Sequence, residues 1–245
     1  MDGNERRVLI QPHLNIKRII NVLYPVKCPF CGKITQDGIC EDCRRAYPFI
    51  GEPICKKCGK PLGDSEKEYC YDCTRKQHVF CEGRALWIHK GKVSEAVYAV
   101  KYKNKRIYGE IFGAEMGKQF SSYLHRHRIS LLIPIPLHKK RRRYRGFNQA
   151  EILARKISEY SGIPVDTDSL VRVKGTVAQK ELDDKQRRRN IKNAFAVTRN
   201  IYAGNVALID DIYTTGSTLD EAADTLLASG VGKVYFLVIS IGQGF

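Results

Sequence analysis

The sequence predicts an α/β protein in which a parallel β-sheet is flanked by helices and preceded by a small cysteine-rich module that binds zinc. Two observations support this prediction. Eight of the nine cysteines form Cys-x-x-Cys pairs between residues 28 and 73. After about residue 82, short apolar runs alternate with amphipathic segments, which is typical of a parallel sheet with helical connections. We therefore expect an N-terminal segment at 1–27, a zinc-ribbon module at 28–80 and an α/β domain at 82–245.

The cysteine pairs have the spacing of zinc ligands. They are Cys28 and Cys31, Cys40 and Cys43, Cys55 and Cys58, and Cys70 and Cys73. Two pairs supply four thiolates, which complete a tetrahedral site and leave no position for water, so we expect two structural Zn²⁺ ions. Sequential pairing along the chain is the simplest arrangement, and a cross-braced pairing would use the same residues. Gly32 and Gly59 follow the first and third pairs, where a knuckle turn favours a positive φ.

The α/β part is predicted from three apolar runs and two amphipathic segments. The runs at 131–136, 205–210 and 233–240 suit parallel strands that are buried on both faces. The segment 146–161 has apolar residues at helical spacing and ends before Gly162. The segment 219–229 has the same pattern, with Gly230 as its C-cap.

The chain is strongly basic, with a formal net charge of +16. This charge favours a polyanionic partner, either a nucleic acid or a phosphorylated small molecule. The basic residues gather in two clusters, which are Lys139, Lys140, Arg141, Arg142, Arg143 and Arg145, and then Lys185, Arg187, Arg188, Arg189 and Lys192. Either cluster taken alone could be an ordinary solvated face. No apolar run is long enough to cross a membrane and no secretory signal is evident, so we expect a cytoplasmic protein without membrane insertion.

The stretch VALIDDIYTTGST, residues 206–218, is the most informative in the α/β part. An apolar run ends in Asp210 and Asp211, at the carboxyl end of a predicted strand, where ligands of parallel sheets bind. The following threonines, Gly216 and the start of the next helix form an anion cradle. Carboxylates beside a phosphate cradle suggest a sugar phosphate and a metal. A plain helix cap at Ser217 is the alternative, and an ATP-binding reading fails because the chain has no GxxxxGK[ST] loop.

The same stretch closely resembles the signature with which type I phosphoribosyltransferases bind 5-phosphoribosyl 1-pyrophosphate (PRPP). The resemblance extends along the chain: IPIPLHKKRRRYRGFNQAEILA, VRVKGTVAQKELDDKQRRRNIKNAF and KYKNK are similar to segments of the ComF family of bacterial competence proteins. A cysteine module in front of a transferase-like domain is also the arrangement of that family. The resemblance implies a type I phosphoribosyltransferase-like fold.

The resemblance also implies roles for individual residues. Asp210 and Asp211 would hold the ribose hydroxyls of PRPP, and its 5′-phosphate would lie on Thr214, Thr215, Gly216, Ser217 and Thr218. Arg143, Arg145, Gly146 and Arg187 are the candidates for the pyrophosphate, which Mg²⁺ would help to neutralise. Residues 173–190 would form a mobile lid.

The resemblance further implies that the protein handles single-stranded DNA taken up during natural transformation, together with other competence proteins. The candidates for DNA binding are Lys139, Lys140, Arg141, Arg142, Tyr144, Arg188 and Arg189. Tyr144 and Phe147 flank the basic cluster and could stack bases, although Phe147 better suits the core. The alternative is an active phosphoribosyltransferase that acts on a base or amine acceptor in nucleotide metabolism, but no residue identifies that acceptor.

Overall fold

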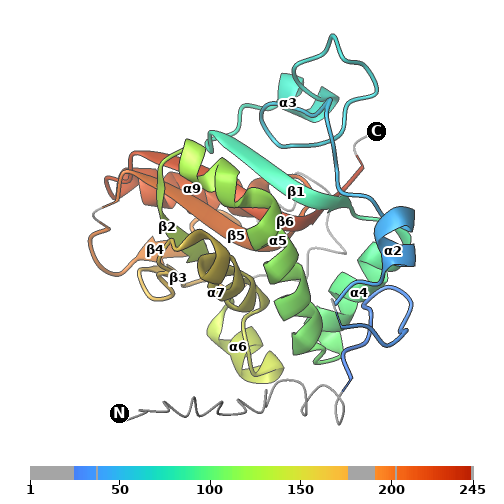
Figure 1. The fold of residues 1–245 in the computed structure, drawn as a ribbon. Helices are drawn as coiled ribbons and strands as arrows, with labels where there is room; N and C mark the ends of the chain where they lie inside the picture. The colour runs from blue at the N-terminus through green and yellow to red at the C-terminus, as the bar shows by residue number, and fades with distance from the viewer. Residues whose placement is uncertain (1–24, 37, 176–190, 202, 244–245) are drawn as a thin grey trace, which may run out of the picture.

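A four-stranded parallel sheet forms the centre of the molecule (Figure 1). The computed structural model describes residues 25–36, 38–175, 191–201 and 203–243. The strand order is β1-β6-β5-β2, and the strands are β1 (Glu82–Ile88), β6 (Lys233–Ile241), β5 (Asn205–Tyr213) and β2 (Ile129–Pro134). The two central strands, β5 and β6, are almost entirely buried, as expected for apolar runs that are covered on both faces.

Helices cover both faces of this sheet. On one face lie α4 (Gly91–Tyr102), α5 (Arg106–Arg126) and α7 (Gln149–Ser161), which share a core with residues such as Ile209 and Leu237. On the other face lie α9 (Ser217–Ala228) and a small antiparallel pair. That pair consists of β3 (Leu170–Arg172) and β4 (Phe195–Val197). The predicted parallel sheet with flanking helices is therefore confirmed.

All five predicted helices and strands begin or end at residues other than those expected, and the strand predicted at 131–136 is β2, which ends at Pro134. The helix predicted at 146–161 begins only at Gln149, as α7, and a separate helix, α6 (Lys139–Arg145), precedes it; Gly146 adopts a left-handed conformation with a φ of 77° and ends α6. Asn148 then caps α7 by accepting a hydrogen bond from the Ala150 amide at 3.1 Å. The strand predicted at 205–210 continues to Tyr213, because its pairing with β6 extends to Ile241.

The cysteine-rich part forms two small ribbons that pack on opposite faces of the sheet. The first contains the short helix α2 (Glu41–Ala46), and its Cys28 and Cys43 join the core beneath α5. The second contains α3 (Tyr71–Arg75), and its Cys55, Cys58 and Cys70 join the core beneath α9. In Figure 1 the two ribbons accordingly lie at separate places on the molecule. Within the described part of the chain, no helix has both the length and the apolar character needed to cross a bilayer.

Candidate functional site

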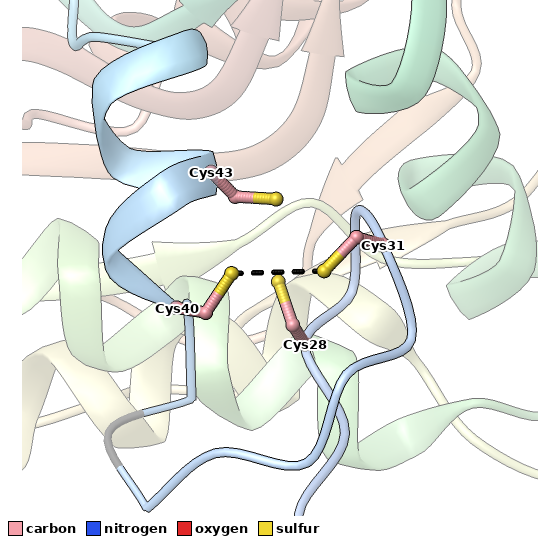
Figure 2. Close-up of side chains that lie close together, drawn as sticks. All are labelled: Cys28, Cys31, Cys40 and Cys43. Carbon is pink, nitrogen blue, oxygen red and sulfur yellow. Dashed lines mark hydrogen bonds between the residues drawn. The ribbon is translucent and has the colours of Figure 1, made fainter.

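The eight paired cysteines form two separate groups of four. Within each group, the sulfur atoms lie within 4.8 Å of one another, and the groups are Cys28, Cys31, Cys40 and Cys43, and Cys55, Cys58, Cys70 and Cys73. Figure 2 shows the sulfur atoms of the first group directed toward a common centre. The structure thus confirms the sequential pairing and rules out the cross-braced one.

The donor set fits Zn²⁺. A Zn–S bond of about 2.3 Å places tetrahedral sulfur atoms about 3.8 Å apart. The Sγ atoms of Cys31 and Cys40, and those of Cys58 and Cys70, are each 3.6 Å apart. Four thiolates leave no open coordination position, so these are structural sites rather than catalytic ones.

The two ribbons are local copies of each other. Gly32 and Gly59 take the predicted positive φ values of 77° and 75°. Two residues after the CxxC motif, Lys33 forms an ion pair with Asp42 in the first ribbon. Lys60 forms the equivalent pair with Asp72 in the second. The repeated turn and ion pair show why the two sites share one geometry.

A pocket of about 690 Å³ opens at the carboxyl end of β5. Asp210 and Asp211 form part of its wall together with the whole of the following loop, residues 214–218. The neighbouring strand β2 ends at Pro134, which pairs with Ile209, so the two acids lie just beyond its end. The acids therefore belong to the central strand β5 but lie past the end of β2, at the carboxyl end of the sheet. Ligands of parallel sheets bind at this end.

The Asp211 carboxylate is buried and held from two sides. The Lys101 ammonium lies 2.7 Å from Oδ1, and the Gln149 amide donates to Oδ2 at 2.8 Å. Lys101 is in the last turn of α4 and Gln149 begins α7, so three elements fix this carboxylate.

Asp210 has a different environment. Its Oδ1 accepts a hydrogen bond from the Asp211 amide at 2.8 Å. Burial, followed by the neighbouring Asp211 carboxylate, raises the pKa of Asp210 to about 7. A carboxyl group with a pKa near neutrality is suited to exchange a proton for a cation.

The loop after β5 is shaped to hold an anion. Gly216 has a φ of 76° and precedes the first residue of α9, so the N-terminus of this helix lines the pocket, where backbone amides favour an anion. The hydroxyls of Thr215 and Ser217 lie 3.0 Å apart. Ser217 is the first helical residue and Gly216 is the N-cap, so the alternative of an ordinary Ser217 cap is wrong.

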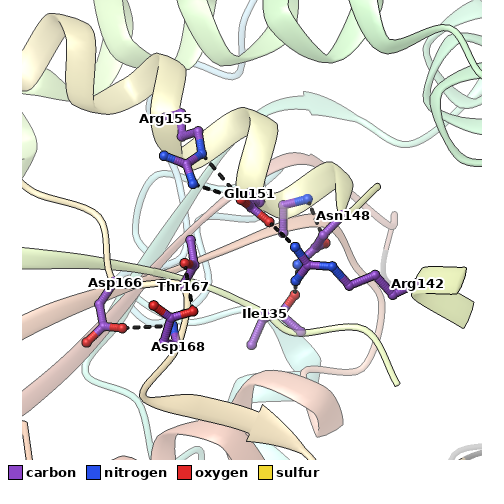
Figure 3. Close-up of polar contacts among 9 residues, drawn as sticks. Ile135, Arg142, Asn148, Glu151, Arg155, Asp166, Thr167 and Asp168 are labelled. Atoms are coloured by element: carbon purple, nitrogen blue, oxygen red, sulfur yellow. Dashed lines mark hydrogen bonds and ion pairs between the residues drawn. The ribbon is translucent and has the colours of Figure 1, made fainter. Parts of the chain in front are cut away.

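Part of the first basic cluster faces this pocket. Arg141 and Arg145 line it, and the Arg145 guanidinium lies 5.4 Å from the ring centre of Tyr102. Arg142 instead pairs with Glu151 on α7 at 3.2 Å (Figure 3). The lining does not include Lys139, Lys140, Arg143, Tyr144 and Gly146, all of which are exposed. Phe147 is buried, as expected for a core residue.

The second basic cluster cannot be placed in this way. Lys185, Arg187, Arg188 and Arg189 lie outside the described residues, as does most of the lid expected at 173–190. Lys192 is described and exposed.

Several residues of the pocket were not singled out from the sequence. They include Lys101, Gln149, Arg172, Tyr98 and Tyr102. Lys101 and Gln149 fall in the segments that carry the family resemblance, which was the available signal. Arg172 is at the end of β3, and burial together with nearby Arg141 lowers the pKa of its guanidinium.

The geometry defines a class of protein: two four-cysteine ribbons attached to a parallel α/β domain with an acid pair and an anion loop in one pocket. A family model described as a double zinc ribbon domain matches residues 19–74. Competence protein F of Haemophilus influenzae is 30% identical over 207 residues, which cover 82% of this chain and 89% of that protein. Competence protein ComFC of Bacillus subtilis is 31% identical over 204 residues, covering 80% of each chain. The chain belongs to the ComF family of competence proteins.

The chain is also similar to a further relative and, over part of its length, to solved structures. DNA utilization protein YhgH of Escherichia coli strain K12 is 29% identical over 203 residues, covering 80% of this chain and 87% of that protein. Among solved structures, a purine phosphoribosyltransferase from Pyrococcus horikoshii matches 53% of this chain and 72% of its own, at 15% identity and a TM-score of 0.33. A hypoxanthine phosphoribosyltransferase from Staphylococcus aureus matches 53% and 62%, at 12% identity and a TM-score of 0.34.

Proposed function

We propose that the pocket at the end of β5 binds PRPP together with Mg²⁺. The observation that supports this most is the acid pair and the anion loop in one pocket of about 690 Å³. An anionic sugar with free hydroxyls is the ligand class that uses both features, because carboxylates accept hydrogen bonds from hydroxyls and helix N-termini attract phosphate.

The remaining groups suit the other parts of PRPP. Carboxylate oxygens are the donors that Mg²⁺ prefers, and Asp210 offers such oxygens to the pocket. Arg141, Arg145 and Arg172 line the same pocket and would bind the pyrophosphate, since guanidinium groups match phosphate oxygens. Arg143 and Gly146 are therefore weaker candidates than they were from sequence.

Isothermal titration calorimetry with Mg–PRPP tests this proposal. Asp211→Asn should abolish binding, because it removes the charge of the carboxylate that Lys101 and Gln149 hold. Asp224→Asn, the same change at an exposed position of α9, should bind like the wild type. Unchanged binding by Asp211→Asn would overturn the assignment.

A second function, the binding of single-stranded DNA in natural transformation, is supported by the surface around the pocket mouth. Tyr98 and Tyr102 are 42% and 54% exposed, and their ring centres are 4.5 Å apart. They adjoin the basic helix α6, and aromatic groups beside basic ones suit single-stranded nucleic acid. The name of the Escherichia coli relative, DNA utilization protein YhgH, agrees with this function.

The salt dependence of oligo(dT) binding tests the second function. Lys139→Ala, Lys140→Ala and Arg143→Ala together remove three exposed cations that do not line the pocket. The slope of log K against log salt should become shallower by about 2, since each contact with a single strand contributes about 0.7. PRPP binding by this variant should be unchanged. An unaltered slope would contradict the role of α6.

The alternative is an active phosphoribosyltransferase with an unidentified base or amine acceptor. Pyrophosphate release distinguishes it from a protein that only binds PRPP. Sustained pyrophosphate release in the presence of an acceptor would establish an enzyme, whereas binding without release would establish a PRPP-binding protein. Our proposal places the protein in the cytoplasm, where it would work with other competence proteins.

A further inference from the structure

The segment that joins the second ribbon to β1 is tied to the first turn of α9. The Lys76 ammonium lies 2.8 Å from Oδ2 of Asp220, and His78 Nδ1 lies 2.9 Å from the same oxygen. The Val79 amide donates to Oδ1 of Asp220 at 3.1 Å. Lys76 also donates to the Thr215 carbonyl at 2.9 Å, so the segment reaches the anion loop itself.

His78 also packs beneath the anion loop. Its Nε2 lies 3.2 Å from the Tyr213 hydroxyl. A Cβ atom added at Gly216 would lie 2.7 Å from that hydroxyl and 3.0 Å from Cε1 of His78. The glycine of the loop therefore rests directly on these two side chains, and their position determines where the loop can lie.

These contacts are shielded from solvent. The side chains of Lys76 and Asp220 are 17% and 15% exposed, and that of His78 is 1% exposed. Although burial alone would raise it, hydrogen bonds from His78 and Lys76 lower the pKa of Asp220. The Asp220 carboxylate is thus ionised at neutral pH, and its ion pair with Lys76 lies in a place where water screens it little.

The contacts continue from the loop into the second ribbon. His78 stacks on Phe80 with ring centres 4.7 Å apart. Phe80 is fully buried in the same core as Cys55, Cys58 and Cys70. The first ribbon lies on the opposite face, where Arg44 binds Glu115 of α5, and its cysteines belong to the other core. Among the residues that the structure describes, these contacts therefore link the anion loop to the second ribbon, whereas the first ribbon belongs to the other core.

We propose that the second four-cysteine site positions the anion loop through Lys76, His78 and Asp220, so that phosphate affinity depends on this site and not on the first. The inference rests on the proposed function of the pocket and adds the element that holds its loop in place. His78 and Asp220 are positioning residues, since they act through the loop.

Matched variants of the two ribbons test the proposal. Cys73→Ser and Cys43→Ser remove equivalent ligands from the second and first sites, and each protein should retain about one zinc per chain. Ribose 5-phosphate is the probe for the loop. Its Kd should rise about tenfold in Cys73→Ser, as expected from the loss of one charge-assisted contact, and should change less than about twofold in Cys43→Ser. Equal effects of the two variants would overturn the proposal.

Asp220→Asn keeps both zinc sites and so avoids a general loss of fold. Ribose 5-phosphate binding should weaken about tenfold, whereas pyrophosphate binding, assigned to the arginines, should not change. A merely structural defect would weaken both ligands. The positioning role would be contradicted if the variant bound both ligands equally more weakly, or if it bound both as tightly as the wild type.

Hydrogen–deuterium exchange separates this inference from the proposed function. Amides of residues 214–218 should exchange faster in Asp220→Asn and Cys73→Ser than in wild type or Cys43→Ser, whether or not ribose 5-phosphate binds. Failure of the wild type to bind the probe would refute the proposed function alone. Unaltered exchange in these amides would refute the positioning by the second ribbon.

Discussion

Lys101 is the residue whose replacement most directly tests how the acid pair is maintained. Its ammonium lies 2.7 Å from Asp211, whose side chain is 5% exposed. In Lys101→Met the apolar stem is kept and the charge is removed, so Asp211 retains only the Gln149 amide as a side-chain donor among these contacts. The variant therefore isolates the contribution of one buried cation.

The expected loss of stability follows from burial and from the partner that remains. Removing one partner of a buried ion pair costs about 3–5 kcal/mol. Lys101 is 20% exposed, so water can reach the site, and Gln149 still donates. We therefore expect the free energy of unfolding to fall by about 2 kcal/mol, which lowers Tm by about 6 °C in a chain of this length.

The same variant should respond more strongly to Mg²⁺. Without the ammonium, Asp211 loses the cation at 2.7 Å, and the paired carboxylates offer oxygen donors that a divalent cation can occupy. Saturating Mg²⁺ should therefore raise the Tm of Lys101→Met by about 4 °C more than it raises the Tm of the wild type.

Differential scanning calorimetry with and without Mg²⁺ measures both effects. Lys103→Met is the matched control, because Lys103 lines the same pocket but is exposed. It should change Tm by less than about 2 °C. A Lys101→Met protein with wild-type Tm and no added response to Mg²⁺ would refute the view that Lys101 compensates the acid pair.

Three further predictions follow from other contacts. Because the pKa of Asp210 is raised to about 7, its carboxyl gains a proton as pH falls below 7; calorimetry should show Mg–PRPP affinity falling from pH 8 to pH 6. Glu115→Ala should cost about 3 kcal/mol in urea unfolding, because it removes a buried carboxylate that the Arg44 guanidinium bonds at 2.7 Å. Gly83→Ala should cost about 3 kcal/mol in the same assay, because the methyl would overlap the buried ring of Phe236.

Each of these has an internal control. Asp210→Asn should flatten the pH profile of binding, and a profile that persists would assign it to the ligand's own phosphates. Asp210→Asn should also remove a contribution that favours the folded state as pH falls from about 7 to about 4, where only the folded protein holds this proton.

Glu110→Ala on the exposed side of α5 and Gly63→Ala in open space should each change stability by less than about 0.5 kcal/mol. Equal losses in these controls would contradict the two packing arguments.

The sequence predicted those parts of the fold whose pattern is local. The runs that form β5 and β6, the apolar face of α9 and the sequential cysteine pairs all depend on neighbouring residues. In contrast, α5 was not predicted because its buried face includes Gly109, Gly113, Gly117 and Glu115 as well as large apolar side chains. β1 was not predicted either, since Glu82 and Arg84 interrupt its apolar residues.

The parts of the site that sequence reasoning missed depend on contacts between distant residues. Asp211 is easily recognised next to Asp210, but Lys101 is 110 positions earlier and contacts it only through the packing of α4 against the sheet. His78 and Asp220 are separated by 142 positions. The charge of a residue can be read from the sequence, whereas its partner depends on the assembled fold.

The two ribbons and the α/β domain depend on each other. A short segment with few large apolar residues gains stability from metal binding and from burial against a larger core. Cys28 and Phe30 are buried against Trp87 and Phe112, with the rings of Phe30 and Trp87 5.4 Å apart. The α/β domain in turn lacks its own cover at these places, since the ribbons complete both faces of one sheet. We therefore expect zinc removal to destabilise the whole chain and not only the segment that carries the cysteines.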